Sequence, residues 1–279
     1  AYRIQDRAAV QAAIEADPEE RNQTNDQTSV SSIRAEKRSE STVDLSVLKQ
    51  AGSTVQTYIA MAGTGRIILV GFLLFVFVMR AAISWDSVFR DGHIALLGND
   101  PYFYRFWVEE LFRSSEPLTE IAGFGEPLML ATLWAAALLL GGTAKAAGLA
   151  LAWYPVVAAL IVGGLLYWIG TLAFDDRRVG YAAVAFYAIT PILTYRSGLG
   201  FGDHHAFDYL MMTLTVFGVV ALATDTSEWQ AVTRRRIAGS IAIVGGTAGA
   251  VHGWSAGPLL VAPIALYSFF APYVDLQSE

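Results

Sequence analysis

Five charged or ionisable side chains lie within one short segment, RSGLGFGDHHAFD, of an otherwise apolar region. They are Arg196, Asp203, His204, His205 and Asp208. Such side chains are costly near hydrocarbon, so an apolar region that keeps them indicates a functional site. In an extended chain, Asp203 and His205 would project to the same side and offer an oxygen and a nitrogen ligand to a metal ion. The alternative for this cluster is a hydrogen-bonded or helix-capping role.

Two ligands make a weak metal site, so a second segment must contribute a further ligand. Asp100 is the best candidate. It lies in GNDPYFYRFWVEELF, where GNDP has turn chemistry and Pro101 suits the first position of an amphipathic helix. Asp100 would then be exposed at the N-terminus of that helix. Here too an alternative stays open, a helix cap beside an aromatic anchor at the membrane surface.

The elements that would position these side chains are membrane-spanning helices. Of the 279 residues, 54% are hydrophobic and 16% charged, whereas a soluble domain has roughly 25% charged residues. The absence of cysteine excludes disulfides, thiol nucleophiles and thiolate metal sites. Apolar stretches of suitable length predict six spans. These spans cover about residues 66–83, 152–174, 179–195, 206–224, 237–251 and 257–271. Arg80, in the first span, is expected to snorkel outward.

The basic residues of the loops set the direction of these spans. We treat residues 127–141 as a helix in or dipping into the outer interface, which leaves the N-terminal tail, residues 175–178 and residues 226–236 on one side. These three regions hold most of the basic loop residues, as is typical of cytoplasmic loops. The long first loop, residues 84–151, is then expected to share the external face with the loop around Asp203.

Residues 1–64 differ from the rest of the chain. They are rich in Glu, Asp, Gln, Ser and Thr and poor in large apolar side chains, which predicts a polar cytoplasmic tail that is largely disordered or loosely helical. Residues 65–279 form the predicted transmembrane portion. The sequence begins with Ala1 and no secretory signal opens it, so we expect a processed, trimmed or partial chain.

The two acidic segments together resemble the catalytic subunit of oligosaccharyltransferase in its archaeal form, a member of the GT-C class of glycosyltransferases. GNDPYFYRFWVE is similar to the acidic motif of the family's first external loop. RSGLGFGDHH is similar to its second motif, an Arg, a Gly-rich stretch and Asp-x-His after the third span. The resemblance covers about residues 66–272. It implies an all-α polytopic membrane protein with a GT-C-like helical bundle and a long first external loop.

The resemblance also implies roles for individual residues. Asp100 would bind a divalent cation, Mn²⁺ or Mg²⁺, and contact the acceptor amide. Asp203 and His205 would be the other metal ligands, and Arg196 would contact the lipid phosphate. His204 is the intervening position, expected to point away from the cation, and is kept as a candidate for substrate contact.

The reaction that the resemblance implies is protein N-glycosylation. An oligosaccharide would pass from a polyprenyl (dolichyl) phosphate carrier to Asn in Asn-x-Ser/Thr, at the external face of the cell membrane. The partners would be the lipid-linked oligosaccharide, the acceptor protein and membrane lipid, with no nucleic acid. The family's further external-loop Glu and its C-terminal soluble domain with a WWDYG-type motif have no counterpart here. We therefore expect an incomplete enzyme, of archaeal origin and inactive in isolation.

Three other functions stay open. The first is another GT-C transferase that uses a lipid-phosphate sugar. The second is a transporter in which an Asp/His relay conducts protons or ions, which would need the cluster near the bilayer midplane. The third is a non-catalytic subunit.

Overall fold

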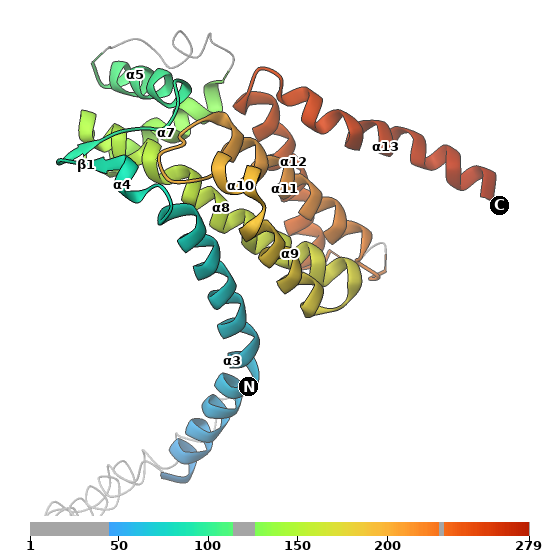
Figure 1. Ribbon diagram of the computed structural model, residues 1–279. Coiled ribbons are helices and arrows are strands. Elements are labelled where there is room, and N and C mark those ends of the chain that lie inside the picture. The colour runs from blue at the N-terminus through green and yellow to red at the C-terminus, as the bar shows by residue number, and fades with distance from the viewer. Residues whose placement is uncertain (1–44, 114–125, 229–231, 279) are drawn as a thin grey trace, which may run out of the picture. The chain divides into compact units, whose positions relative to one another are not determined.

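The structure is a computed structural model that describes residues 45–113, 126–228 and 232–278 (Figure 1). The chain divides into two compact units, residues 1–64 and residues 65–279. Most of the predicted polar tail lies outside the described residues.

The described residues are helical except for loops and one short hairpin. The first part contains α3 (Leu45–Ala81), α4 (Trp85–Val88), the antiparallel pair β1 (Phe89–Arg90) and β2 (His93–Ile94), α5 (Asp100–Arg113) and α7 (Pro127–Leu139). The second part contains α8 (Ala144–Phe174), α9 (Arg177–Ile189), α10 (Pro191–Arg196), α11 (His204–Ala223), α12 (Arg234–Gly253) and α13 (Gly257–Ser278). The prediction of an all-α fold is confirmed.

Three helical stretches among the described residues are long and apolar enough to cross a membrane. They are Gly63–Ala81, Ala144–Phe174 and His204–Ala223. They overlap the first, second and fourth predicted spans, and they support an integral membrane protein. The second stretch begins at Ala144 rather than at residue 152, because Thr143 caps the helix and its hydroxyl accepts a hydrogen bond from the Ala146 N–H at 3.1 Å.

The structure divides the third predicted span, residues 179–195, into two helices. α9 ends at Ile189, Thr190 is extended with ψ 115°, and α10 begins at Pro191. Proline lacks an N–H and disfavours the helical conformation in the residue before it, which explains the break. The expectation of one continuous helix is corrected here, and the 13 residues of α9 are fewer than the roughly 20 that a span needs.

The remaining predicted spans, residues 237–251 and 257–271, correspond to α12 and α13. α12 has 20 residues but opens with three arginines. The stretch Gly257–Tyr267 of α13 and the whole of α7 are shorter apolar helices. Only the three stretches named above combine the length and composition of a span within the described ranges.

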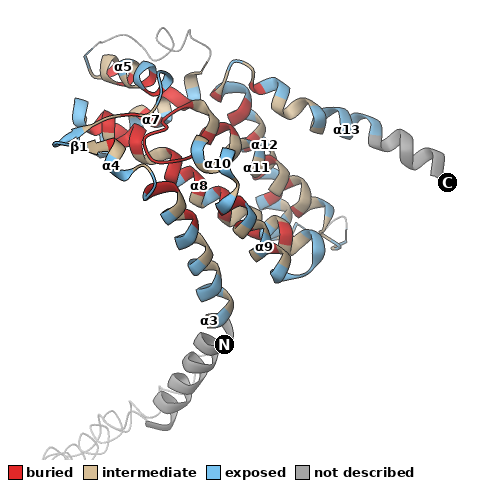
Figure 2. Ribbon diagram, viewed as in Figure 1, coloured by how far each residue is buried: buried red, intermediate tan, exposed pale blue. Residues whose placement is uncertain are grey.

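The buried residues gather along α8 and along the segments that pack against it (Figure 2). One apolar cluster joins α5, α7 and the first half of α8. α11 packs against α8 and α12, and α9 packs against α8 (Figure 1). This core places the loop before α11 against α8 and the first loop.

Arg80, expected to snorkel outward, is buried and only 1% exposed. Its guanidinium donates to the carbonyls of Tyr187 and Ala188, both at 2.9 Å. The Tyr187 carbonyl would bond the N–H of residue 191 in a continuous helix, but that residue is Pro191 and has no N–H. The arginine therefore satisfies helix-end carbonyls that the break leaves without a helical N–H donor. The snorkelling prediction is wrong for this reason.

Candidate metal centre

The site is carried by the loop between α10 and α11, residues 197–202, here termed the glycine loop. Every residue in it is buried, which is uncommon for a connecting segment (Figure 2). At two positions of this loop the surroundings leave room only for glycine. Gly200 has φ +81°, and a Cβ there would collide with the Val88 side chain. A Cβ at Gly202 would lie 2.6 Å from the Leu151 carbonyl oxygen.

Three elements far apart in the sequence bind the backbone of the glycine loop. The Leu199 N–H donates to the Arg80 carbonyl at 2.9 Å, and the Gly200 N–H donates to the Ala152 carbonyl at 2.9 Å. The Gly200 carbonyl accepts from the Leu97 N–H at 2.8 Å. These bonds pair backbone groups that would lower the stability of the fold if they were buried without a partner. The last of them also sets the segment before Asp100 side by side with the glycine loop.

Asp203 follows the glycine loop and is the N-cap of α11. Its backbone is extended (φ −105°, ψ 168°), and its carboxylate accepts a hydrogen bond from the His204 N–H at 2.6 Å. His204 and His205 are the first two residues of the helix. The geometry is therefore that of a helix start, whereas the sequence analysis expected an extended segment. The carboxylate is 2% exposed.

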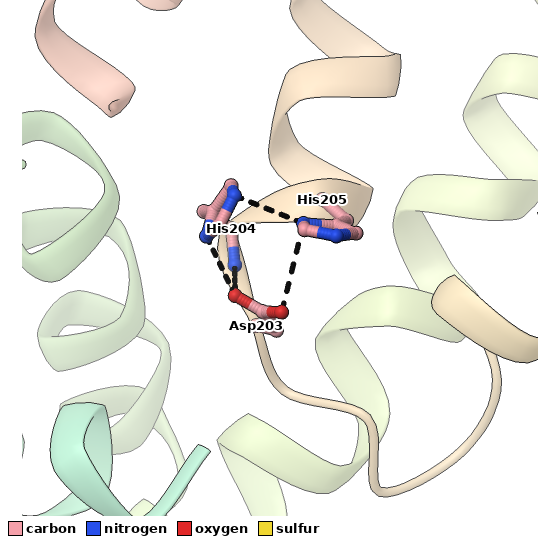
Figure 3. Close-up of side chains that lie close together, drawn as sticks. All are labelled: Asp203, His204 and His205. Carbon is pink, nitrogen blue, oxygen red and sulfur yellow. Dashed lines mark hydrogen bonds and ion pairs between the residues drawn. The ribbon is translucent and has the colours of Figure 1, made fainter. Parts of the chain in front are cut away.

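The side chains of Asp203, His204 and His205 point toward one another (Figure 3). Asp203 Oδ1 is 2.6 Å from His204 Nδ1, and Asp203 Oδ2 is 3.5 Å from His205 Nδ1. His205 Nδ1 is 2.9 Å from His204 Nε2. One ligand atom from each residue lies within 4.8 Å of the other two. The expectation that His204 points away is wrong, and one oxygen and two imidazole nitrogens at these separations fit a divalent metal ion.

The charge state of Asp203 also suits a metal ligand. Burial by itself raises the pKa of this carboxyl, but the hydrogen bonds from His204 and the charge of the two imidazoles outweigh burial, so the pKa lies below its usual value. The carboxyl is therefore a carboxylate at neutral pH, the form that binds cations.

Arg196, the last residue of α10, lies beside Asp203. Its Nη1 is 3.8 Å from Asp203 Oδ2, and its side chain is 36% exposed whereas that of Asp203 is almost fully buried. The guanidinium carbon lies 5.2 Å from the ring centre of Phe201 and 5.8 Å from that of Tyr195. The aromatic rings support the guanidinium by cation–π contact and leave part of it open to an anion.

Two further residues contact His204 and were not assigned to the site from the sequence. The ring of Trp254, in the α12–α13 connection, stacks on His204 with centroids 4.7 Å apart and planes at 13°. Asp208 lies one helical turn along α11, buried, with Oδ2 3.8 Å from His204 Nε2. The sequence signal for Trp254 was the HGWSA break between two apolar stretches.

Asp100 is the first residue of α5, as predicted, and is exposed. It is not part of the group formed by Asp203, His204 and His205. The structure thus brings together two of the three predicted ligands, and it places the third on the segment that pairs with the glycine loop.

Glu126 is a carboxyl near the site that the sequence analysis did not select. It precedes α7 and accepts a hydrogen bond from the Tyr104 hydroxyl at 2.5 Å. Burial raises the pKa of Glu126, the bond from Tyr104 opposes that shift, and the charges of Asp203 and Asp100 add to it, so the pKa stays above its usual value. A glutamate directly before Pro127 at a helix start was the available sequence signal.

No family model and no curated protein matches this sequence. Solved structures do match it. The Archaeoglobus fulgidus oligosaccharyltransferase in its apo form has a TM-score of 0.60 and 22% identity, over 75% of this chain and 26% of that chain.

Two further structures match in the same way. The archaeal oligosaccharyltransferase AglB from A. fulgidus, in complex with an inhibitory peptide and a dolichol-phosphate, has a TM-score of 0.60 and 21% identity, over 76% of this chain and 26% of that chain. The A. fulgidus enzyme complexed with Zn and sulfate has a TM-score of 0.59 and 23% identity, over 73% and 27%. The chain thus spans about a quarter of the length of these proteins. Over that length it has the fold of an archaeal oligosaccharyltransferase, a membrane enzyme of the GT-C class.

Proposed function

We propose that this chain is part of an oligosaccharyltransferase that transfers an oligosaccharide from a polyprenyl (dolichyl) phosphate carrier to Asn in Asn-x-Ser/Thr segments. The observation that carries the proposal is the group of Asp203, His204 and His205 at the start of α11, within a fold similar to that of the A. fulgidus enzyme. That enzyme is known in complex with an inhibitory peptide and a dolichol-phosphate, and we extend both kinds of ligand to this chain.

The cofactor that we propose is a divalent cation, Mn²⁺ or Mg²⁺. The Asp203 carboxylate and the His205 imidazole are suitable ligands, with Asp100 from the neighbouring segment as a further one. A complex with Zn and sulfate is known for the A. fulgidus enzyme. When bound, the cation would stabilise the negative charge that develops on the leaving phosphate.

The residues of the chain would bind and orient the two substrates. Arg196 has the planar, permanently charged group that suits a lipid phosphate, and it lies next to Asp203 with part of its surface open. The Asp100 carboxylate would accept a hydrogen bond from the acceptor amide N–H, which localises the lone pair on the nitrogen. His204 contacts both Asp203 and Trp254, so we assign it to the metal group and not to substrate contact.

The location of the site favours transfer over transport. The group lies at the N-terminal end of the candidate span His204–Ala223, whereas an ion relay would need it near the middle. By the loop charges, this end would face the exterior, with the N-terminus in the cytoplasm.

Arg196→Gln is expected to weaken binding of dolichyl phosphate by at least roughly tenfold, because a charged hydrogen bond to phosphate contributes about 1.5–3 kcal/mol. Native mass spectrometry of the purified chain, titrated with dolichyl phosphate in the presence of Mn²⁺, measures this change. Arg178→Gln is the control, since Arg178 is an exposed arginine in the first turn of α9. Equal binding by the two variants would contradict the phosphate-binding role.

A further inference from the structure

Arg80 is a buried cation in the apolar helix α3, and the site described above does not account for it. Its side chain is 1% exposed, and among the described residues no carboxylate forms an ion pair with it. A buried charge without a counter-ion is costly unless hydrogen bonds satisfy it. An apolar residue would avoid the cost of burying a charge but would leave the Tyr187 carbonyl without the donor that Arg80 supplies, and the remaining donors of the guanidinium are free for a second task.

The contacts of Arg80 form two sets, one at the end of α9 and one around the end of α10. On one side the guanidinium donates to the Tyr187 and Ala188 carbonyls at the end of α9, and its carbon lies 4.8 Å from the centre of the Tyr187 ring. On the other side Nη1 donates to Thr194 Oγ1 and Nε donates to Ser197 Oγ, both at 2.8 Å. The first set satisfies carbonyls at the end of α9, where Pro191 interrupts the helix. The second set reaches the residues on either side of the phosphate-binding candidate, Arg196.

The backbone of Arg80 adds a further bond to the same loop. Its carbonyl accepts from the Leu199 N–H at 2.9 Å. Ser197 is the first residue of the glycine loop and the C-cap of α10, and its hydroxyl donates onward to the Leu193 carbonyl at 2.7 Å. One residue of α3 therefore binds the end of α10 and the beginning of the loop that leads to Asp203.

We infer that Arg80 is a positioning residue, which holds the end of α10 and the glycine loop so that Arg196 and Asp203 face one ligand. The inference rests on the proposed function, because it takes that ligand to be a metal-bound phosphate. Arginine suits the task, since its rigid planar fork directs donors at two carbonyls and two hydroxyls at once. Lysine has its three donors on a single nitrogen and cannot reach all four acceptors.

The test compares Mn²⁺ affinity with thermal stability for the full chain in detergent, using the EPR signal of free Mn²⁺ for the affinity. Arg80→Met is expected to bind Mn²⁺ roughly tenfold more weakly. Loss of a group that orients metal ligands typically lowers metal affinity by about 10- to 100-fold, and we expect the lower value here. Arg80→Lys is expected to fall between Arg80→Met and the wild type. Arg66→Met is the control, an exposed arginine on the same helix, and is expected to bind like the wild type.

Ser197→Ala keeps the test decisive if Arg80→Met fails to fold. This variant removes the Nε acceptor in the glycine loop and leaves the contacts of Arg80 with the α9 carbonyls in place. The inference predicts weaker Mn²⁺ binding in a chain that stays folded. Wild-type affinity in folded Ser197→Ala would overturn the inference and leave the proposed function standing. Absence of Mn²⁺ binding by the wild-type chain would overturn both.

Discussion

Asp203→Asn is expected to weaken Mn²⁺ binding by at least roughly 100-fold while the chain stays folded. Asparagine is as good an N-cap as aspartate and has nearly the same volume, so α11 keeps its start. The amide oxygen is neutral and therefore binds a hard divalent cation more weakly than a carboxylate oxygen does. Groups that merely orient metal ligands contribute about 10- to 100-fold to affinity, so loss of a direct ligand should cost at least roughly 100-fold. An EPR titration of free Mn²⁺ measures the affinity, and circular dichroism measures the helix content.

Asp176→Asn is the matched control for this substitution. Asp176 is the N-cap of α9, and its side chain accepts a hydrogen bond from the Arg178 N–H at 2.8 Å. Both substitutions therefore replace the N-cap aspartate of a helix by asparagine, but Asp176 lies outside the metal group. We expect wild-type Mn²⁺ affinity for Asp176→Asn. Equal affinities for Asp176→Asn and Asp203→Asn would show that Asp203 is a cap without a role in metal binding.

Gly200→Ala is expected to lower the free energy of unfolding by roughly 2–6 kcal/mol, the combined cost of a non-glycine residue at positive φ and of overpacking a core. The residue has φ +81°, and the added methyl group would collide with Val88, which is fully buried. Because the backbone of Gly200 bonds both α8 and the first loop, we also expect weaker Mn²⁺ binding. Thermal unfolding in detergent, followed by tryptophan fluorescence, measures the loss of stability.

Gly164→Ala is the control for adding one methyl group to the chain. Gly164 lies within α8, and a Cβ there would have no atom within 4 Å. This variant is expected to be neutral or about 0.5–1 kcal/mol more stable, since alanine favours a helix. Adding Val88→Ala to Gly200→Ala should restore part of the stability, because it removes the collision but not the backbone strain. Equal stability of Gly200→Ala and Gly164→Ala would contradict the proposed packing of the loop.

The sequence predicted the helices best where the signal was local. Long apolar runs indicated the spans that overlap α3, α8 and α11, because span length and side-chain hydropathy do not depend on the rest of the fold. The break at Pro191 was visible as a proline within an apolar run. It was not predicted, since a helix can continue through proline when neighbours satisfy the freed carbonyls. Arg80 shows that here they are satisfied by a side chain more than 100 residues away.

The site residues were selected by type and spacing, but their geometry depends on tertiary contacts. Asp203 and His205 do come together, although a helix start and not an extended chain is responsible. His204 contacts its neighbours Asp203 and His205, but it also stacks on Trp254, some 50 residues later, a contact that no local pattern encodes. Glu126 was not selected because its contact with Tyr104 forms only in the folded chain.

The short hairpin of β1 and β2 had a local sequence signal, but that signal was not used for a prediction. Asp91 and Gly92 form a two-residue turn with φ values of 48° and 78°. Asp-Gly is the sequence typical of such a turn. The β1–β2 pair could therefore have been predicted, and it lies in the loop that leads to Asp100.

The central claim is that one divalent cation is held by side chains at the start of α11. Electron spin echo envelope modulation of Mn²⁺ bound to the purified chain tests it most directly, because a coordinated imidazole gives a ¹⁴N coupling that water and carboxylate ligands do not. We predict a ¹⁴N coupling in the wild-type chain that is weakened or lost in His205→Ala. Bound Mn²⁺ without any ¹⁴N coupling, or a coupling unchanged in His205→Ala, would contradict the account.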